Sequence, residues 1–295
     1  MARKQVDRLA LLAWLALGVI WGSNFIFMKW ATELISPLQV VLARVVFGFL
    51  PVFVYALANK QLKLSDLKHS THFVAMACLA AVVYYYGFAH GTSLLPSGIA
   101  GAVSGSIPLF SMIAAVTLLP DEKLSRYRVM GLLVGLLGVV MIARPFESAI
   151  DLTSAEGVIF MVIGSLSLGV SFVYARRFVT PLNLSAAALT TYQLGFACLI
   201  LIFSTPLDGV AAILTDTRAS VGLILGLGLL GTGFAYILYY FIINRLGAVG
   251  ASTVTYLPPI VALLIGAVFV GEPIEMLDIV AAGLILGGVF LINRR

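Results

Sequence analysis

The chain has few charged residues and only two cysteines. Of its 295 residues, 11% are charged and 61% are hydrophobic, and the mean hydropathy is +1.08. Soluble domains typically carry about 25% charged residues. The apolar surface therefore exceeds what one water-soluble core can bury, which excludes a soluble domain and predicts an integral membrane protein.

The two cysteines give no sign of a disulfide or a metal site. Cys78 and Cys198 both lie within apolar runs, where a thiol behaves as a small hydrophobic side chain. They predict neither a disulfide nor a zinc site, and they do not indicate a compartment.

Apolar runs bounded by charges or turn residues occur ten times, and each crossing of a bilayer needs about 20 residues. The runs fall at roughly 9–30, 36–58, 71–94, 97–119, 126–144, 155–177, 184–205, 219–243, 248–270 and 274–292. The third and fourth runs are nearly continuous, and we separate them at Pro96-Ser97-Gly98 because these are turn residues. The sequence predicts an all-α polytopic membrane protein with ten transmembrane helices.

The basic residues lie in the short connections, although the net charge is +5 and the pI is about 9.3. Nucleic acid is therefore not a predicted partner. With the N-terminus inside, fourteen of the 18 Lys and Arg residues fall inside, Lys29, Arg144 and Arg218 fall outside, and Arg44 lies within a run. Because Lys and Arg are retained on the cytoplasmic side, both termini are predicted to be cytoplasmic in a multi-pass membrane protein; the family resemblance described below implies the cell (inner) membrane.

The chain repeats itself at a nearly constant offset. The pairs at an offset of 150 are Pro108 with Pro258, Glu122 with Glu272, Gly138 with Gly288 and Arg144 with Arg294, and those at an offset of 147 are Gly22 with Gly169, Phe25 with Phe172, Lys29 with Arg176 and Gly48 with Gly195. The halves 1–147 and 148–295 then hold five helices each. Since five is odd, the second half enters the membrane from the opposite side, which makes an inverted repeat.

An inverted repeat has a functional meaning. Two similar halves in opposite orientations can exchange an outward-open cavity for an inward-open one around a central site, which is the geometry of a transporter. Apolar helices also resemble one another through composition alone, but the shared Pro and Glu positions argue against that explanation.

One short motif resembles a known family. The sequence VIWGSNF at 19–25 is similar to the opening signature of the EamA branch of the drug/metabolite transporter superfamily. Ala43-Arg44, Pro108, Pro258 and Gly271-Glu272-Pro273 add to the resemblance. The first half has Asp121-Glu122 in place of Gly-Glu, and the second half has Leu168-Gly169 and Thr191 in place of Trp-Gly and Arg. The resemblance implies a ten-helix bundle with a central cavity that moves small metabolites, such as amino acids, out of the cell.

Arg44 is a candidate substrate-binding residue. It lies about eight residues into the second run, roughly 12 Å along the helix axis. A cation at that depth is costly unless it faces protein or water, so it marks a functional site by default. It could dock a substrate carboxylate, or it could be a structural arginine that binds backbone carbonyls or reaches the surface.

The third run carries Tyr84, Tyr85 and Tyr86 near its middle, followed by His90. Consecutive helical positions advance by about 100°, so the three phenols cannot share a face and at least one is expected to point inward. Each ring offers a stacking surface, and His90 could bind a proton near neutral pH. Ordinary helix packing remains the alternative for all four.

Further polar residues lie in the first, fourth, eighth and ninth runs, which the resemblance implies line the cavity. They are Asn24, Ser104, Ser106, Tyr236, Tyr240, Thr255 and Tyr256. Ser and Thr also join helices in membranes without any ligand. Pro108, Pro258 and Pro259 should break or kink the fourth and ninth helices, which favours a hinge.

Several motifs are missing. There is no GxxxxGK[ST], so ATP is not the predicted driver, and no HExxH or Cys/His cluster indicates a metal or another cofactor. Ser104 within Gly101–Gly105, with His90 before it, lacks the spacing of a rhomboid-type protease, so no enzyme is predicted. No Asp or Glu lies in the middle of a run, which leaves His90, a carboxylate nearer the surface or facilitated flow for coupling.

The sequence predicts a secondary transporter that exports amino acids or related compounds by alternating access. The alternative is an exporter of drugs or toxic cations, which the lack of deep carboxylates disfavours, or of nucleoside-like metabolites. One deep Arg without a Lys cluster makes a phosphate-bearing substrate less favoured. The predicted partners are a small-molecule substrate and the lipid bilayer, and the chain is expected to be a monomer or a weak homodimer.

Overall fold

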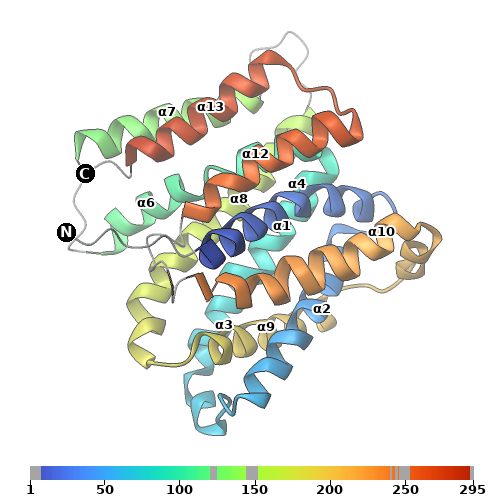
Figure 1. Cartoon of the computed structure of the whole chain (residues 1–295), viewed down its shortest axis with the longest axis vertical. Helices are drawn as coiled ribbons and strands as arrows, with labels where there is room; N and C mark the ends of the chain where they lie inside the picture. Colours follow the sequence, from blue (N-terminus) through green and yellow to red (C-terminus); the bar gives the residue numbers. More distant parts are fainter. Residues whose placement is uncertain are drawn as a thin grey trace.

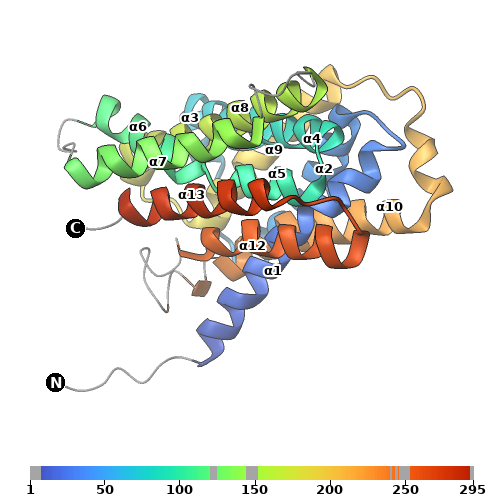
Figure 2. The same cartoon turned by 90° about the horizontal axis from the view of Figure 1, so that it is seen from above.

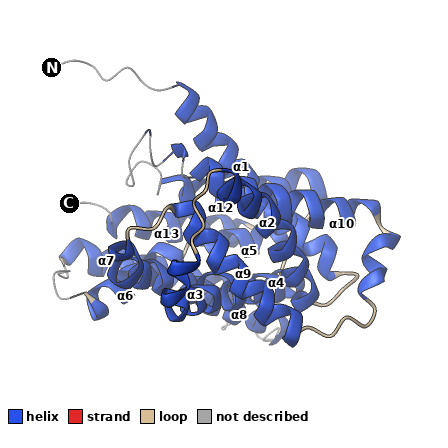
Figure 3. Cartoon of the chain, turned by 90° about the horizontal axis from the view of Figure 1, so that it is seen from below, coloured by secondary structure: helices blue, strands red, loops and turns tan. Residues whose placement is uncertain are grey.

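The computed structural model describes residues 8–119, 125–143, 152–239, 241–242, 245 and 253–292. These residues form helices joined by short loops, with no strand among them (Figure 3). The helices are α1 (Arg8–Thr32), α2 (Pro37–Ala58), η1 (Leu64–His69), α3 (Ser70–Ala77), η2 (Cys78–Val82), α4 (Val83–Leu94), α5 (Ser97–Ser104), α6 (Ile107–Leu118), α7 (Arg126–Ala143), α8 (Leu152–Tyr174), η3 (Ala175–Val179), η4 (Thr180–Leu182), α9 (Ala186–Ser204), η5 (Val210–Thr215), α10 (Thr217–Val221), η6 (Gly222–Phe234), η7 (Thr253–Tyr256), α12 (Leu257–Leu264), η8 (Ile265–Val270) and α13 (Met276–Ile292).

The described helices group into ten apolar segments, as the sequence predicts. Seven are long and apolar enough to cross a membrane, namely Arg8–Thr32, Pro37–Ala58, Leu64–Leu94, Ser97–Leu118, Leu152–Leu182, Ala186–Ser204 and Thr217–Tyr239. Two shorter ones are Val254–Val270 and Met276–Ile292, and α7, with 18 residues, completes the set. The predicted separation of the third and fourth crossings is confirmed, because α4 ends at Leu94 and α5 begins at Ser97. The predicted division at 147/148 lies outside the described residues.

The start of α2 shows how local sequence ends one crossing and begins the next. The Ser36 hydroxyl accepts from the Gln39 backbone N–H at 3.3 Å, and the Gln39 side chain accepts from the Ser36 N–H at 3.0 Å. Pro37 opens the first turn, where its missing N–H costs nothing. The turn after α1 is therefore specified by three adjacent signals.

Helices α7 and α13 pack side by side at one edge of the bundle (Figures 1 and 2). A Cβ added to Gly131 would lie 2.5 Å from the Gly288 carbonyl oxygen, and one added to Gly138 would lie 2.5 Å from that of Ala281. One residue number rises as the other falls, so the two helices run antiparallel. At the offset of 150, Gly131 corresponds to Ala281 and Gly138 to Gly288. The two contacts are therefore equivalent under the inverted repeat.

A second pair of contacts obeys the same symmetry. Gly22 of α1 faces Val261 of α12, and Gly169 of α8 faces Ser111 of α6. Gly22 and Gly169 are equivalent in the repeat, and so are Ser111 and Val261. Close approach at glycine is a common way for membrane helices to associate. The first helix of each repeat, α1 or α8, thus packs against a helix of the other repeat. Figure 1 shows α1 beside α12.

Two charged side chains hold the short link between α4 and α5. Lys29 Nζ donates to the carbonyl oxygens of Ser93 and Leu95, both at 3.1 Å, at the end of α4. The Glu272 carboxylate accepts from the Ser97 N–H at 2.7 Å and from the Gly98 N–H at 2.9 Å, at the start of α5. A cation at a helix C-terminus and an anion at an N-terminus are each favourable. Because Glu272 belongs to the second repeat, the link also joins the two halves.

Candidate substrate-binding site

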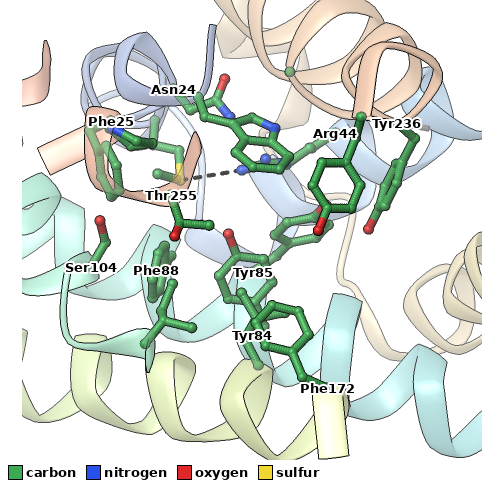
Figure 4. Close-up of a pocket in the computed structure, with 17 residues that line it drawn as sticks. Asn24, Phe25, Arg44, Tyr84, Tyr85, Phe88, Ser104, Phe172, Tyr236 and Thr255 are labelled. Carbon is green, nitrogen blue, oxygen red and sulfur yellow. Dashed lines mark hydrogen bonds between the residues drawn. The ribbon is translucent and has the colours of Figure 1, made fainter. Parts of the chain in front are cut away.

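A cavity of about 150 Å³ lies where the two repeats meet (Figure 4). It is bounded by α1, α2, α4, α8, η6 and the fourth and ninth crossings. The residues that line it are Trp21, Asn24, Phe25, Met28, Arg44, Tyr84, Tyr85, Phe88, Ser104, Ile107, Leu168, Phe172, Gly231, Tyr236, Tyr239, Thr255 and Pro258. Most are aromatic or aliphatic, so the cavity is an apolar chamber with a few polar groups.

Arg44 is the one charged side chain among the described residues that line this cavity. It is 4% exposed, and its Nε donates to the Thr232 hydroxyl at 3.0 Å. Its Nη1 lies 3.8 Å from Met28 Sδ, drawn as a dashed line in Figure 4. The guanidinium carbon lies 4.0 Å from the centre of the Tyr85 ring, in a cation–π contact. All of these partners are electrically neutral.

Asn24 completes the surroundings of Arg44. With its amide oriented so that both groups are satisfied, the oxygen accepts from Arg44 Nη2 at 3.1 Å and the nitrogen donates to the Ile20 carbonyl at 3.1 Å. Asn24 is 4% exposed, and Gly231 of η6 lies against its side chain. The absence of a side chain at Gly231 leaves Asn24 room to reach the guanidinium.

Tyr84 and Tyr85 both line the cavity. Their rings lie 4.7 Å apart, and the Tyr84 ring meets Phe88 edge to face at 4.6 Å. Phe25 in turn packs on Phe88 at 5.8 Å. These rings form one wall of the chamber, opposite Tyr236 in Figure 4.

Ser104, Tyr236, Thr255 and Pro258 also line the cavity, as the sequence predicts for side chains in these crossings. Ser104 Oγ donates to the Gly101 carbonyl at 2.6 Å, which leaves its oxygen free to accept. The predicted break is present in the fourth crossing, where α5 ends at Ser104 and α6 begins at Ile107, next to Pro108. In the ninth crossing the described helix is continuous, and its winding changes from the 3₁₀ turn η7 to α12 at Leu257, next to Pro258. Pro108 and Pro258 lie in the first turns of α6 and α12, where a proline is compatible with a helix. Pro259 is buried beside Gly105.

The structure places four other predicted site residues away from the cavity. His90 Nε2 lies 2.9 Å from Glu156 Oε1, and the His90 ring meets Phe160 at 4.1 Å. Tyr86 stacks on His90 and lines a separate shallow groove. Ser106 is fully buried, and Tyr256 packs against the Leu109 cluster. Tyr240 lies outside the described residues.

Several lining residues were not predicted. They are Trp21, Phe25, Met28, Phe88, Ile107, Leu168, Phe172, Gly231 and Tyr239. Trp21 and Met28 share one face of α1 with Asn24, because they lie three and four residues from it, whereas Phe25 is turned by about 100° from Asn24. That spacing was the available signal. Thr232, whose hydroxyl accepts a hydrogen bond from Arg44, is adjacent to Gly231. No comparable spacing in the sequence predicted its role.

The site has no arrangement for covalent chemistry among the described residues. Ser104 hydrogen-bonds to a backbone carbonyl, whereas His90 pairs with Glu156 on a different part of the bundle. No group of three His, Cys, Asp or Glu side chains in the described part of the chain could hold a metal ion. The geometry defines a binding chamber within a polytopic membrane protein, which is the kind of site that a transporter has.

The chain belongs to the EamA-like transporter family, whose model matches residues 8–144 and 155–294. This is a family of transporters, not of enzymes. The chain is 25% identical to the uncharacterized transporter YoaV of Bacillus subtilis (strain 168) over 273 residues, and these aligned residues make up 92% of each of the two proteins. It is 26% identical to the uncharacterized inner membrane transporter YedA of Escherichia coli (strain K12), over 94% of this chain and 88% of YedA. It is 24% identical to an uncharacterized transporter of Archaeoglobus fulgidus, over 96% of this chain and 99% of that protein.

One solved crystal structure has a similar fold. It superposes with a TM-score of 0.58 at 21% sequence identity, over 96% of this chain and 95% of that one. The fold of this chain is thus similar to one that has been observed experimentally.

Proposed function

We propose that this protein is a secondary transporter that exports small carboxylate-bearing metabolites, with amino acids and related compounds as the first class to test. The central cavity is the substrate site, and Arg44 binds the carboxylate. The protein acts in the cell inner membrane with both termini in the cytoplasm, as a monomer or a weak homodimer. The name of the YedA relative, an inner membrane transporter, supports the location.

The observation that carries this proposal is that Arg44 is buried among neutral partners. A guanidinium inside a membrane is costly and usually pairs with an opposite charge or with backbone carbonyls. The described partners of Arg44 are instead a hydroxyl, a thioether, an amide and an aromatic ring. Arg binds carboxylates through parallel N–H donors. A substrate carboxylate would supply the missing charge.

The inverted repeat supports transport by alternating access. The cavity lies between the two repeats, and beside it the fourth crossing is broken between Ser104 and Ile107, whereas the ninth changes its winding at Leu257. Short helices that meet at a central site can tilt separately and open it to one side at a time.

Export of drugs or toxic cations is the less favoured function. A cation would enter a chamber whose only described charge is that of Arg44, and like charges in an apolar site repel strongly. A nucleoside-like substrate could use the aromatic walls, but it would leave the Arg44 charge without a counter-ion.

The proposal is tested in proteoliposomes with a panel of labelled amino acids, with and without a pH gradient. The variants are Arg44→Gln and, as a matched control, Arg126→Gln, because Arg126 is an exposed arginine at the start of α7. A charged hydrogen bond contributes about 2 kcal/mol, so Arg44→Gln should raise KM by about thirtyfold, whereas Arg126→Gln should match the wild type. Saturable uptake that is unaffected by Arg44→Gln would contradict the role of Arg44, and uptake of organic cations alone would contradict the substrate class.

A further inference from the structure

We infer that the preferred substrate is a monocarboxylate anion with a single aromatic ring and no ammonium group. This inference rests on the proposed function and narrows it, because the same cavity and the same Arg44 bind the ligand. It concerns the net charge of the ligand and the size of its apolar part.

The charge of the cavity comes first. Arg44 contributes one positive charge, and the described lining contains no Asp or Glu. No Asp or Glu lies in the middle of any crossing of the sequence either. A ligand with one net negative charge would make the occupied cavity neutral, whereas a zwitterion would leave the positive charge in place. Buried charge is favourable only when it is compensated.

The guanidinium is held so that it keeps donors for a ligand. A guanidinium has five N–H groups, and three are used by Thr232, Met28 and Asn24. Thr232 is itself fixed, because its hydroxyl donates to the Leu227 carbonyl at 3.0 Å. Two N–H groups remain, one on each terminal nitrogen, which is the number that a bidentate carboxylate accepts.

An ammonium group would have no comparable partner. In an α-amino acid the ammonium is bonded to the carbon next to the carboxylate, so a carboxylate held at Arg44 brings the ammonium close to the guanidinium. The two cations repel each other in this apolar chamber. The aromatic faces could attract the ammonium, but the Tyr85 face is already occupied by Arg44 itself. The zwitterion is therefore penalised relative to its deaminated analogue.

The walls set the size of the apolar part. A cavity of about 150 Å³ that is lined by apolar side chains is large enough to bind benzene, and this chamber has about the same volume. Phe25, Phe88 and Tyr84 already contact one another edge to face or tilted, which is how aromatic rings prefer to pack. One further ring, carried by the ligand, fits this wall, whereas a fused or two-ring ligand would exceed the space.

Three ligands that share a phenylethyl group separate the charge states. Phenylpropionate carries only the carboxylate, phenylalanine carries carboxylate and ammonium, and phenethylamine carries only the ammonium. Equilibrium binding to the purified full-length protein is followed by tryptophan fluorescence, because Trp21 lines the cavity. We expect phenylpropionate to bind about tenfold tighter than phenylalanine, and phenethylamine not to bind. Acetate, which lacks the ring, should bind far more weakly than phenylpropionate.

The variants show whether the signal comes from this site. Arg44→Gln should weaken phenylpropionate binding by about thirtyfold, and Arg126→Gln should preserve it. Arg44→Lys retains the charge but not the two parallel donors, so it should weaken binding and keep the preference for phenylpropionate over phenylalanine. This second variant keeps the test decisive if Arg44→Gln fails to fold.

Each outcome has one meaning. Equal or tighter binding of phenylalanine would overturn this inference and leave the proposed carboxylate transporter standing. Equal binding of acetate and phenylpropionate would overturn the aromatic part. If phenethylamine were the sole ligand, both this inference and the proposed function would fail.

Discussion

Arg44 of the first repeat donates from Nε to the hydroxyl of Thr232 in the second repeat across 3.0 Å. Both side chains are buried, and the Thr232 hydroxyl in turn donates a hydrogen bond to the Leu227 carbonyl. The bond therefore fixes the guanidinium relative to η6 and joins the two halves of the protein at the cavity. A movement of one repeat against the other would change the position of the charge that we propose binds substrate.

The hydroxyl of Thr232 should matter more than its shape. Thr232→Val keeps the size of the side chain and removes the acceptor, which leaves the buried Arg44 Nε–H without a partner at a cost of about 1–3 kcal/mol. We expect weaker phenylpropionate binding and a lower thermal unfolding temperature, measured on purified protein. Thr232→Ser keeps the hydroxyl and is the matched control, which should bind like the wild type. Equal behaviour of the valine and serine variants would show that the bond does not position Arg44.

A side chain at Gly231 should disturb the site without touching Arg44. A Cβ at this position would overlap the end of the Asn24 side-chain amide, at the nitrogen that donates to the Ile20 carbonyl, so Gly231→Ala should push Asn24 away from Arg44 Nη2. We predict that the affinity for carboxylate ligands falls while the fold, followed by circular dichroism, is retained. Gly283→Ala is the control, because a Cβ at Gly283 meets nothing within 4 Å. If Gly231→Ala bound ligand as tightly as the control, Asn24 would have no part in holding the guanidinium.

The Glu272 carboxylate should stabilise the link between α4 and α5. Glu272→Gln removes the negative charge at the start of α5 and presents one oxygen, instead of two, to the N–H groups of Ser97 and Gly98. The expected loss is about 1–2 kcal/mol, seen as a lower unfolding temperature in detergent. Glu33→Gln, at the exposed end of α1, provides the comparison and should leave the temperature unchanged. Similar unfolding temperatures for the two variants would rule out a stabilising role for the contact.

Where α7 packs against α13, the protein should tolerate a larger side chain at Gly287 but not at Gly288. Gly288→Val would place its Cβ 2.5 Å from the Gly131 carbonyl oxygen, whereas a Cβ at Gly287 meets nothing within 4 Å. The two substitutions carry the same helix propensity, so the difference between them reports the packing. We expect Gly288→Val to destabilise the protein by about 2–3 kcal/mol and Gly287→Val to be tolerated, as judged by thermal unfolding and yield. Equal tolerance of both would contradict the close contact of these helices.

The sequence allowed the crossings to be predicted to within a few residues. Predicted runs at 36–58 and 274–292 correspond to Pro37–Ala58 and Met276–Ile292. This succeeds because a lipid environment requires a continuous apolar stretch that satisfies its own backbone hydrogen bonds. The π-helical segments η2, η3, η6 and η8 were not predicted, because a local change of helix winding leaves hydropathy unaltered.

The candidate site was predicted in part. Arg44, Asn24 and Ser104 were found because a polar residue deep in an apolar run stands out. Trp21, Phe25 and Met28 were not, because an aromatic or aliphatic residue suits the lipid face as well as the cavity wall. The spacing of Trp21 and Met28 from Asn24 marked the inner face of α1, but only a polar residue could be recognised as facing inward.

The sequence by itself determined the number of crossings, the internal repeat and the depth of Arg44, since each follows from hydropathy or from residue identity along the chain. Only the tertiary structure decided which faces turn inward. Tyr84 and Tyr85 line the cavity while Tyr86 packs on His90 outside it, and the partners of Arg44 and His90 are Thr232 and Glu156, far away in sequence. A helix that is apolar on all sides has no polar face to set its rotation, so packing against its neighbours sets it instead.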